Sequence, residues 1–283
     1  MNPMMAVRWA CLWLGVLVLG PVVWLLVSRG VMSDGVTQAS AALGRGGVVP
    51  GLLRGLVAMA LACAFGHAVV RLSSVRWGMF TAGLGLLWGA WGGASMETML
   101  RAAGANAGGA LMTLAAETLA LGAIGCAVAW WLSVRAPGCD RSADPANSPR
   151  ADDLALGVGF GALAAAVVAW QVARTAMPGQ GAAVGLLSGG IGALLAGVVT
   201  GRVSLPGVVG GVSLAGAASM AVASLGVGAD GWIDTTAELG GLAPMTRVSP
   251  WAWAAGAVAG APMGMSWAKS LAPRQGAQAA SPA

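Results

Sequence analysis

Long apolar stretches, separated by short polar or glycine- and proline-containing segments, run along nearly the whole chain. A helix rises about 1.5 Å per residue, so about 20 apolar residues cross the roughly 30 Å hydrocarbon core of a bilayer. We therefore predict an all-α, polytopic transmembrane bundle of about eight helices. The predicted helices cover residues 7–28, 52–70, 78–94, 109–134, 154–172, 182–200, 205–227 and 250–268.

The first apolar stretch has two interpretations, a retained helix or a secretory signal peptide. It is longer than the usual apolar core of a signal peptide, about 7–15 residues, and no small-residue cleavage site follows closely. Arg29 ends the apolar run. We therefore predict a retained membrane helix, which Pro21 is expected to kink.

A polar, proline-rich linker at residues 136–153 divides the chain. Residues 136–153 contain three prolines and six charged residues, which is typical of a solvated connection. The sequence thus predicts an N-terminal four-helix half at 1–135, a C-terminal four-helix half at 154–270 and a disordered tail at 271–283. The two halves do not align convincingly as an internal repeat.

Composition supports the membrane class. Charged residues make up 9% of the chain, against about 25% in soluble globular proteins, and hydrophobic residues make up 57%. These values exclude a soluble enzyme and a disordered protein. The net charge is +5, but no basic run with interleaved aromatic residues occurs, so we expect no nucleic-acid partner. The expected partner is the lipid bilayer.

The distribution of basic residues predicts an orientation in the cell membrane. If the eight predicted helices cross in turn, nine Lys and Arg residues lie on the side of both termini and six lie on the other side. Cytoplasmic loops carry the excess of basic residues, so both termini are expected in the cytoplasm. The nine residues are Arg8, Arg71, Arg76, Arg135, Arg141, Arg150, Arg202, Lys269 and Arg274.

Glycines four residues apart form rows on three predicted helices. Lipid tails are as apolar as leucine, so membrane helices associate through close packing, which small residues at this spacing permit. We expect these rows to form helix-packing seams, either within the chain or against partner subunits. The rows are Gly85, Gly89 and Gly93; Gly181, Gly185 and Gly189; and Gly256, Gly260 and Gly264.

Tryptophans near the ends of the apolar runs, such as Trp251, are typical of the membrane interface. The alternative is stacking on a bound aromatic ligand or sugar, for which Trp88 and Trp91 are the best placed.

Ionisable residues inside a membrane are costly, and each is therefore a candidate functional residue. Glu117 lies within the fourth predicted helix, between Thr113 and Thr118, which are positioned to hydrogen-bond it. One interpretation is a proton or cation site. The alternative is a buried carboxylic acid that bonds a neighbouring helix and fixes its register.

Three further residues are intramembrane polar candidates. Glu97 and Arg101 have the i, i+4 spacing of a helical ion pair. They are expected in a short interfacial helix or re-entrant turn whose apolar side (Met96, Met99 and Leu100) faces lipid. The pair is either an outer gate or anion contact, or a solvated surface pair. His67, the single histidine, is expected to be structural or, alternatively, a proton shuttle or cofactor ligand.

Motifs for catalysis are missing. The four cysteines form neither a CxxC motif nor a cysteine–histidine cluster, so we predict no metal site and no cofactor. No nucleotide-binding or hydrolase motif occurs, which makes an enzyme the least favoured class. Two functions remain. One is movement of a small solute or ion, with Glu117, alone or together with Arg101, on its path; the other is a non-catalytic membrane subunit that packs against partner proteins through its glycine seams.

Overall fold

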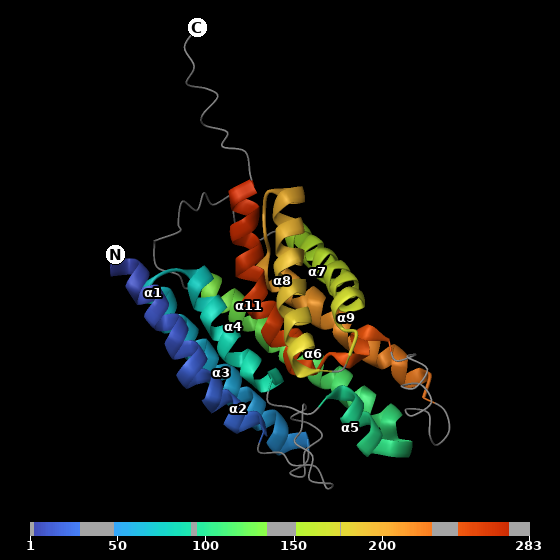
Figure 1. Cartoon of the computed structure of the whole chain (residues 1–283). Helices are drawn as coiled ribbons and strands as arrows, with labels where there is room; N and C mark the ends of the chain where they lie inside the picture. Colours follow the sequence, from blue (N-terminus) through green and yellow to red (C-terminus); the bar gives the residue numbers. More distant parts are fainter. Residues whose placement is uncertain are drawn as a thin grey trace.

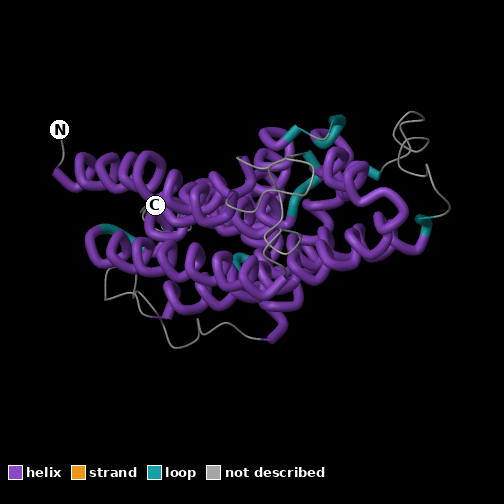
Figure 2. Tube along the Cα trace, turned by 90° about the horizontal axis from the view of Figure 1, so that it is seen from below, coloured by secondary structure: helices purple, strands orange, loops and turns teal. Residues whose placement is uncertain are grey.

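The computed structural model describes residues 3–28, 48–91, 95–134, 151–175, 177–227 and 243–271. Within these residues the fold contains helices and short connections but no strand (Figure 2), so the predicted all-α bundle is confirmed. The described part of the chain has these helical elements: α1 Pro3–Leu14, η1 Gly15–Leu19, α2 Gly20–Ser28, α3 Val48–Leu72, α4 Val75–Trp91, α5 Met96–Ala103, η2 Gly104–Asn106, α6 Ala107–Val134, α7 Ala151–Val172, α8 Pro178–Thr200, α9 Leu205–Leu225, η4 Pro244–Arg247 and α11 Pro250–Leu271.

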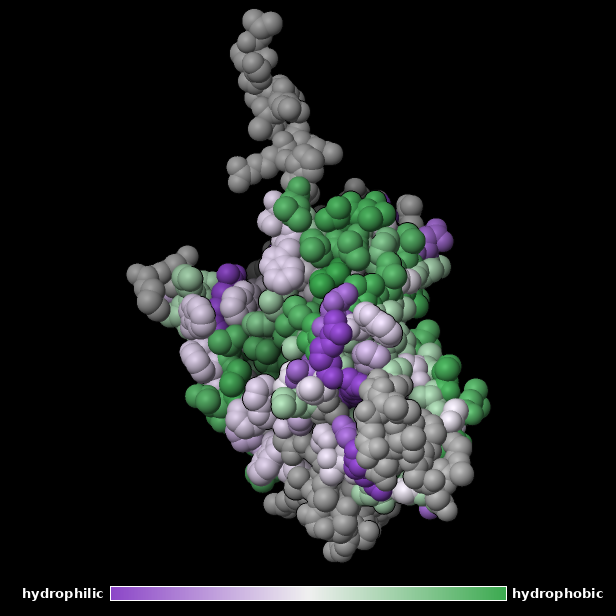
Figure 3. All heavy atoms as spheres, turned by 45° about the vertical axis from the view of Figure 1, so that its right-hand side comes forward, coloured by the Kyte–Doolittle hydropathy of each residue, from purple (hydrophilic) through white to green (hydrophobic). Residues whose placement is uncertain are grey.

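In the described part of the chain, six helical segments are long and apolar enough to cross a membrane, and the chain is an integral membrane protein. These segments are Pro3–Ser28, Val49–Leu72, Met96–Val134, Ala151–Val172, Pro178–Thr200 and Leu205–Leu225. The remaining two long helices are α4, with 17 residues, and α11. Much of the surface is apolar (Figure 3), as expected for side chains that contact lipid tails.

The ends of the helices define two ends of the bundle (Figure 1). At one end lie the beginning of α1 and the end of α11, together with the turn from α3 to α4; we call it the proximal end. The opposite end, with α5 and η4, is the distal end. Both described ends of the chain therefore lie on one side, while their assignment to the cytoplasm stays a prediction.

Helix α11 occupies the centre of the bundle. It packs against α8, α4, α9 and α6 (Figure 1). Residues 250–262 are all buried. Trp251 and Trp253 are fully buried. The prediction of an interfacial Trp251 is therefore wrong, because this helix is surrounded by protein at the level of its first turn.

The first membrane segment is irregular just before Pro21. Residues Gly15–Leu19 form a π-helix, and the Gly20 amide donates to the Gly15 carbonyl, five residues back. Proline has no amide proton, and its ring clashes with the carbonyl four residues before it, so a helix must widen or bend at this point. The predicted effect of Pro21 thus takes the form of a π-turn.

Two glycine rows pack directly on each other between α8 and α11. A Cβ atom on Gly256 would lie 2.5 Å from the Gly185 carbonyl carbon. A Cβ on Gly260 would overlap the Leu186 carbonyl oxygen, and one on Gly264 would overlap that of Gly190. The two backbones are therefore in contact, and even alanine would not fit at these positions.

A second seam joins α7 to α9. A Cβ on Gly157 would lie 3.1 Å from the Gly207 Cα atom, and one on Gly161 would lie 2.5 Å from the Val208 carbonyl oxygen. The third predicted row lies in α4, where Gly85 faces Leu19 and Gly89 faces the ring of Trp251. Gly93 lies outside the described residues.

Candidate functional site: buried Glu117

Glu117 is buried in α6, with 1% of its surface exposed. It lies ten residues after Ala107, the first residue of α6, or about 15 Å from the distal end of this helix. Leu114 and Leu121, one turn to either side, are buried as well. The carboxyl group therefore sits within the apolar part of the bundle.

The two threonines beside Glu117 bond to the backbone of their own helix. The Thr118 hydroxyl donates to the Leu114 carbonyl at 2.7 Å, with the Met220 sulfur of α9 at 3.6 Å. The Thr113 hydroxyl donates to the Gly109 carbonyl at 2.9 Å. Each hydroxyl thus has an acceptor within α6, as is common for threonine in apolar helices.

Around this level of the bundle, aromatic and small residues fill the interior. Gly55 of α3 packs closely against Trp251 and Leu121. A Cβ atom added at Gly55 would lie 3.5 Å from the Trp251 ring and 3.9 Å from the Leu121 side chain. The indole nitrogens of Trp251 and Trp253 are buried and have no hydrogen-bond partner. Burial of an N–H group without a partner is unfavourable, so contacts of the rings with neighbouring helices must offset this cost.

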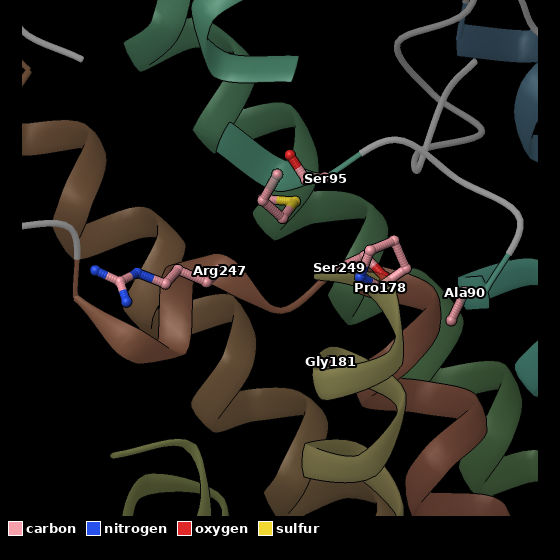
Figure 4. A pocket seen from close by; sticks show the side chains of 7 residues that line it. Ala90, Ser95, Pro178, Gly181, Arg247 and Ser249 are labelled. Carbon is pink, nitrogen blue, oxygen red and sulfur yellow. The ribbon is translucent and has the colours of Figure 1, made fainter. Parts of the chain in front are cut away.

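The pocket in Figure 4 lies elsewhere, at the distal end between α4, α5, α8 and the start of α11. It has room for about one water molecule. Ser95 and Ser249 supply hydroxyl groups, whereas the Arg247 guanidinium is turned away from them (Figure 4). The residues that line this pocket do not include Glu117.

Arg247 instead caps a helix end. Its Nη1 donates to the Ala173 carbonyl at 3.3 Å and also to the carbonyl of Arg174, at the C-terminus of α7. The positive charge complements the negative end of the helix dipole there. The role of Arg247 in this geometry is to tie η4 to α7.

Glu97 and Arg101 form an ion pair on α5. Arg101 Nη2 lies 2.8 Å from Glu97 Oε1, and about 40% of each side chain is exposed (43% and 39%). An exposed i, i+4 pair of this kind contributes about 0.3–0.5 kcal/mol. Ser95 caps α5 by accepting from the Thr98 amide at 3.1 Å. The geometry thus resembles a solvated surface pair more than a gate.

The apolar side of α5 does not face lipid. Met96, Met99 and Leu100 are each at most 1% exposed and belong to the core. The expectation that they contact lipid is wrong, because α5 lies against α6 and η4 and buries this side in protein.

His67 lies in α3 near the proximal end, far along the bundle from α5. Its Nε2 accepts a hydrogen bond from Arg71 Nε at 3.3 Å, and its Nδ1 is buried without a partner. Among the described residues, no group of three or more His, Cys, Asp or Glu side chains is arranged to hold a metal ion. The structure therefore places His67 with Arg71 and not with Glu117.

Sequence reasoning missed the polar contacts between helices at the proximal end. Arg8 Nε donates to the Ser73 hydroxyl at 2.9 Å, and Arg76 Nη1 donates to the Ser266 hydroxyl at 3.4 Å. The arginines were visible as flanking charges, but their partners are 65 and 190 residues away in the chain. Only the fold brings them together.

Comparison with known proteins gives no relative: no family model, no curated protein and no solved structure matches this chain.

Proposed function

We propose that this integral membrane protein is a multi-pass, non-catalytic subunit of the cell membrane that packs against partner membrane proteins. The observation that carries the proposal is the closed surroundings of Glu117, which is 1% exposed and does not line the distal pocket. A transporter instead needs polar groups that converge on a water-accessible site near the midplane.

The buried threonines support this interpretation. In the described part of the chain, the buried polar residues other than Glu117 are all serines and threonines: Thr81, Thr118, Ser188, Ser204, Ser213, Thr246 and Ser249. Thr81 and Thr246 donate to carbonyls three or four residues earlier, as Thr118 does. Hydroxyls bonded in this way offer little to a passing ion, whereas the Ser188 and Ser213 hydroxyls are buried without a hydrogen-bond partner among the described residues.

The glycine seams fit a rigid body better than a moving one. The rows of α8 and α11 contact each other, and so do the glycine pairs of α7 and α9. These seams are used inside the chain, so a partner protein would contact other, outward-facing residues. We therefore modify the initial hypothesis, in which the seams themselves bind the partner.

A cysteine at position 117 tests the closed interior. In a background where the native cysteines are replaced by alanine, the Glu117→Cys variant is expected to resist a membrane-impermeant thiol reagent added to either side of sealed vesicles. Water must reach a thiol for it to ionise and react, and a side chain sealed from water does not react. The measurement is the fraction of labelled protein by mass spectrometry.

Arg174→Cys serves as the matched control, because Arg174 is exposed at the distal end. It should be labelled from one side of the vesicles. Labelling of Glu117→Cys at a rate close to that of the control would contradict a closed interior and favour a water-filled path.

Movement of an ion is the second candidate function, because a buried carboxyl group in a membrane helix is a common feature of proton and cation paths. We expect proteoliposomes with the wild-type chain and with Glu117→Gln to show the same proton uptake under an imposed membrane potential. A pH-sensitive dye inside the vesicles reports this flux. Uptake that depends on Glu117 would replace the subunit proposal with a transport function.

The subunit role itself is tested in native membranes. The tagged chain, extracted in mild detergent, should migrate in a complex larger than its own 27.7 kDa, with a second membrane protein at fixed stoichiometry. Crosslinking in the intact membrane before extraction should yield the same pair. A chain that stays monomeric under both conditions would rule out a stable subunit role.

A further inference from the structure

The first membrane segment is attached to the bundle unevenly along its length. In α1 the buried side chain is that of Cys11, whereas Met5 and Trp13 are each 53% exposed. In α2, by contrast, Val23 and Val27 are buried. Helix α2 packs against α4 and α3, whereas α1 touches α4 at few positions and lies at the edge of the bundle (Figure 1). The described bundle therefore holds α2 closely and α1 loosely.

Close contact with the bundle begins at the π-turn Gly15–Leu19. A Cβ atom on Gly15 would lie 3.1 Å from the Thr81 carbonyl oxygen of α4. A Cβ atom on Gly20, just after the turn, would lie 2.4 Å from the Trp88 ring. The π-turn and the start of α2 are thus fixed on α4, so a movement of α1 relative to the bundle has its pivot at Gly15.

The backbone around this pivot resists bending less than a regular helix does. Pro21 has no amide proton, so a carbonyl in the turn before it lacks the usual helical hydrogen bond. Glycine is a weak helix former, and helices bend at π-turns, prolines and glycines. The first membrane segment combines all three features within residues 15–21.

Arg8 holds the loosely attached helix to the bundle. It lies seven residues, or about 10 Å, before Gly15. Its Nε donates to the Ser73 hydroxyl at 2.9 Å, and its guanidinium carbon lies 6.0 Å from the centroid of the Trp77 ring. Phe80 packs edge-on against Trp77, with the ring centroids 6.0 Å apart. A charged hydrogen bond and a cation–π contact are strong enough to hold α1 and weak enough to break reversibly.

We propose that α1 is a strap that opens and closes over the start of α4, with its pivot at Gly15 and with Arg8 as its latch. In the closed state Arg8 contacts Ser73 and Trp77. In the open state these contacts break and α1 moves into the surrounding lipid, to which most of its apolar side chains are already exposed. Opening uncovers the side of α4 around Trp77. This inference stands independently of the proposed subunit role.

Distances between spin labels in the full-length protein test the proposal. In a background where the native cysteines are replaced by alanine, one label pair joins Met5→Cys on α1 to Trp130→Cys on α6. The measurement is double electron–electron resonance in lipid nanodiscs. We expect one main distance with the latch intact. Arg8→Gln should broaden the distribution or add a second distance, because loss of a charged hydrogen bond raises the open fraction by about tenfold or more.

The matched control pair joins Leu25→Cys on α2 to the same Trp130→Cys position. Leu25 is 45% exposed and lies beyond the pivot, on the part of the segment that packs against α4. The distance distribution of this pair should stay the same when Arg8→Gln is introduced.

A second latch variant, Ser73→Ala, separates the latch from effects of charge on membrane insertion. It removes the acceptor of the Arg8 hydrogen bond and leaves both the charge and the Trp77 contact in place. Its open fraction should lie between those of the intact latch and of Arg8→Gln. If Arg8→Gln does not insert correctly, Ser73→Ala provides the comparison.

Two results would overturn the proposal. The first is an unchanged distance distribution of the Met5–Trp130 pair in both latch variants, which would show that Arg8 does not hold α1. The second is equal broadening for the Met5–Trp130 and Leu25–Trp130 pairs, which would mean that the whole segment loosens and that Gly15 is not a pivot.

Discussion

Gly260→Ala is expected to break the contact between α8 and α11 and to destabilise the protein by about 3 kcal/mol or more. Overpacking of a protein core usually costs about 1–3 kcal/mol, and here the added methyl group overlaps the carbonyl oxygen of Leu186. A backbone oxygen cannot rotate away as a side chain can. The measurement is the thermal transition of the purified protein in detergent, followed by fluorescence-detected size exclusion.

Gly159→Ala in α7 is the matched control. Gly159 is exposed, and a Cβ atom there has no other atom within 4 Å. Alanine favours a helix over glycine by about 1 kcal/mol, so this variant should be as stable as the wild type or slightly more stable. Equal loss of stability in both variants would mean that the glycine seam does not determine the packing.

Trp251→Ala is the second substitution with a large expected effect. The Trp251 ring is fully buried where α3, α4 and α6 meet α11, against Gly55, Gly89 and Leu121. Removal of such a ring costs about 3–5 kcal/mol in soluble proteins. In a membrane the unfolded helices are already in an apolar solvent, so the cavity and the lost van der Waals contacts make up most of the cost. We therefore expect about 3 kcal/mol.

Trp170→Ala provides the comparison, because Trp170 is 63% exposed. Loss of an exposed side chain changes stability by under about 1 kcal/mol. Both variants are measured by reversible unfolding in mixed micelles. A small effect of Trp251→Ala, within error of Trp170→Ala, would show that α11 is not the packed centre of the bundle.

The helices were predictable because the apolar runs are long and their borders are polar. The fifth predicted helix illustrates the error at a border: it was expected from residue 154 and begins at Ala151. Asp152 and Asp153 lie in its first turn, where acidic residues are favourable near the positive end of the helix dipole. Because they are charged, Asp152 and Asp153 are assigned to the linker in the sequence, although they belong to the first turn of the helix.

The neighbours of each apolar face were not predictable. A leucine or methionine that contacts lipid cannot be distinguished in the sequence from one that contacts another helix, since both surroundings are apolar. Met99 was thus expected in lipid and is buried, and Trp251 was expected at the interface and is in the core. Glu117 is recognisable in the sequence as a charge within an apolar run, but the closed packing around it follows from helices that are distant in the chain.

The central position of α11 has a consequence for how the protein is made. This helix leaves the ribosome after all the other described helices, and it is not among the six described segments that are long and apolar enough to cross a membrane. Its lysine, proline and glycines lower its hydropathy, whereas the surface of α8 accepts its glycines closely. The helices that precede α11 must therefore leave room for it, so that insertion of α11 and closure of the bundle around it become one coupled step of biogenesis.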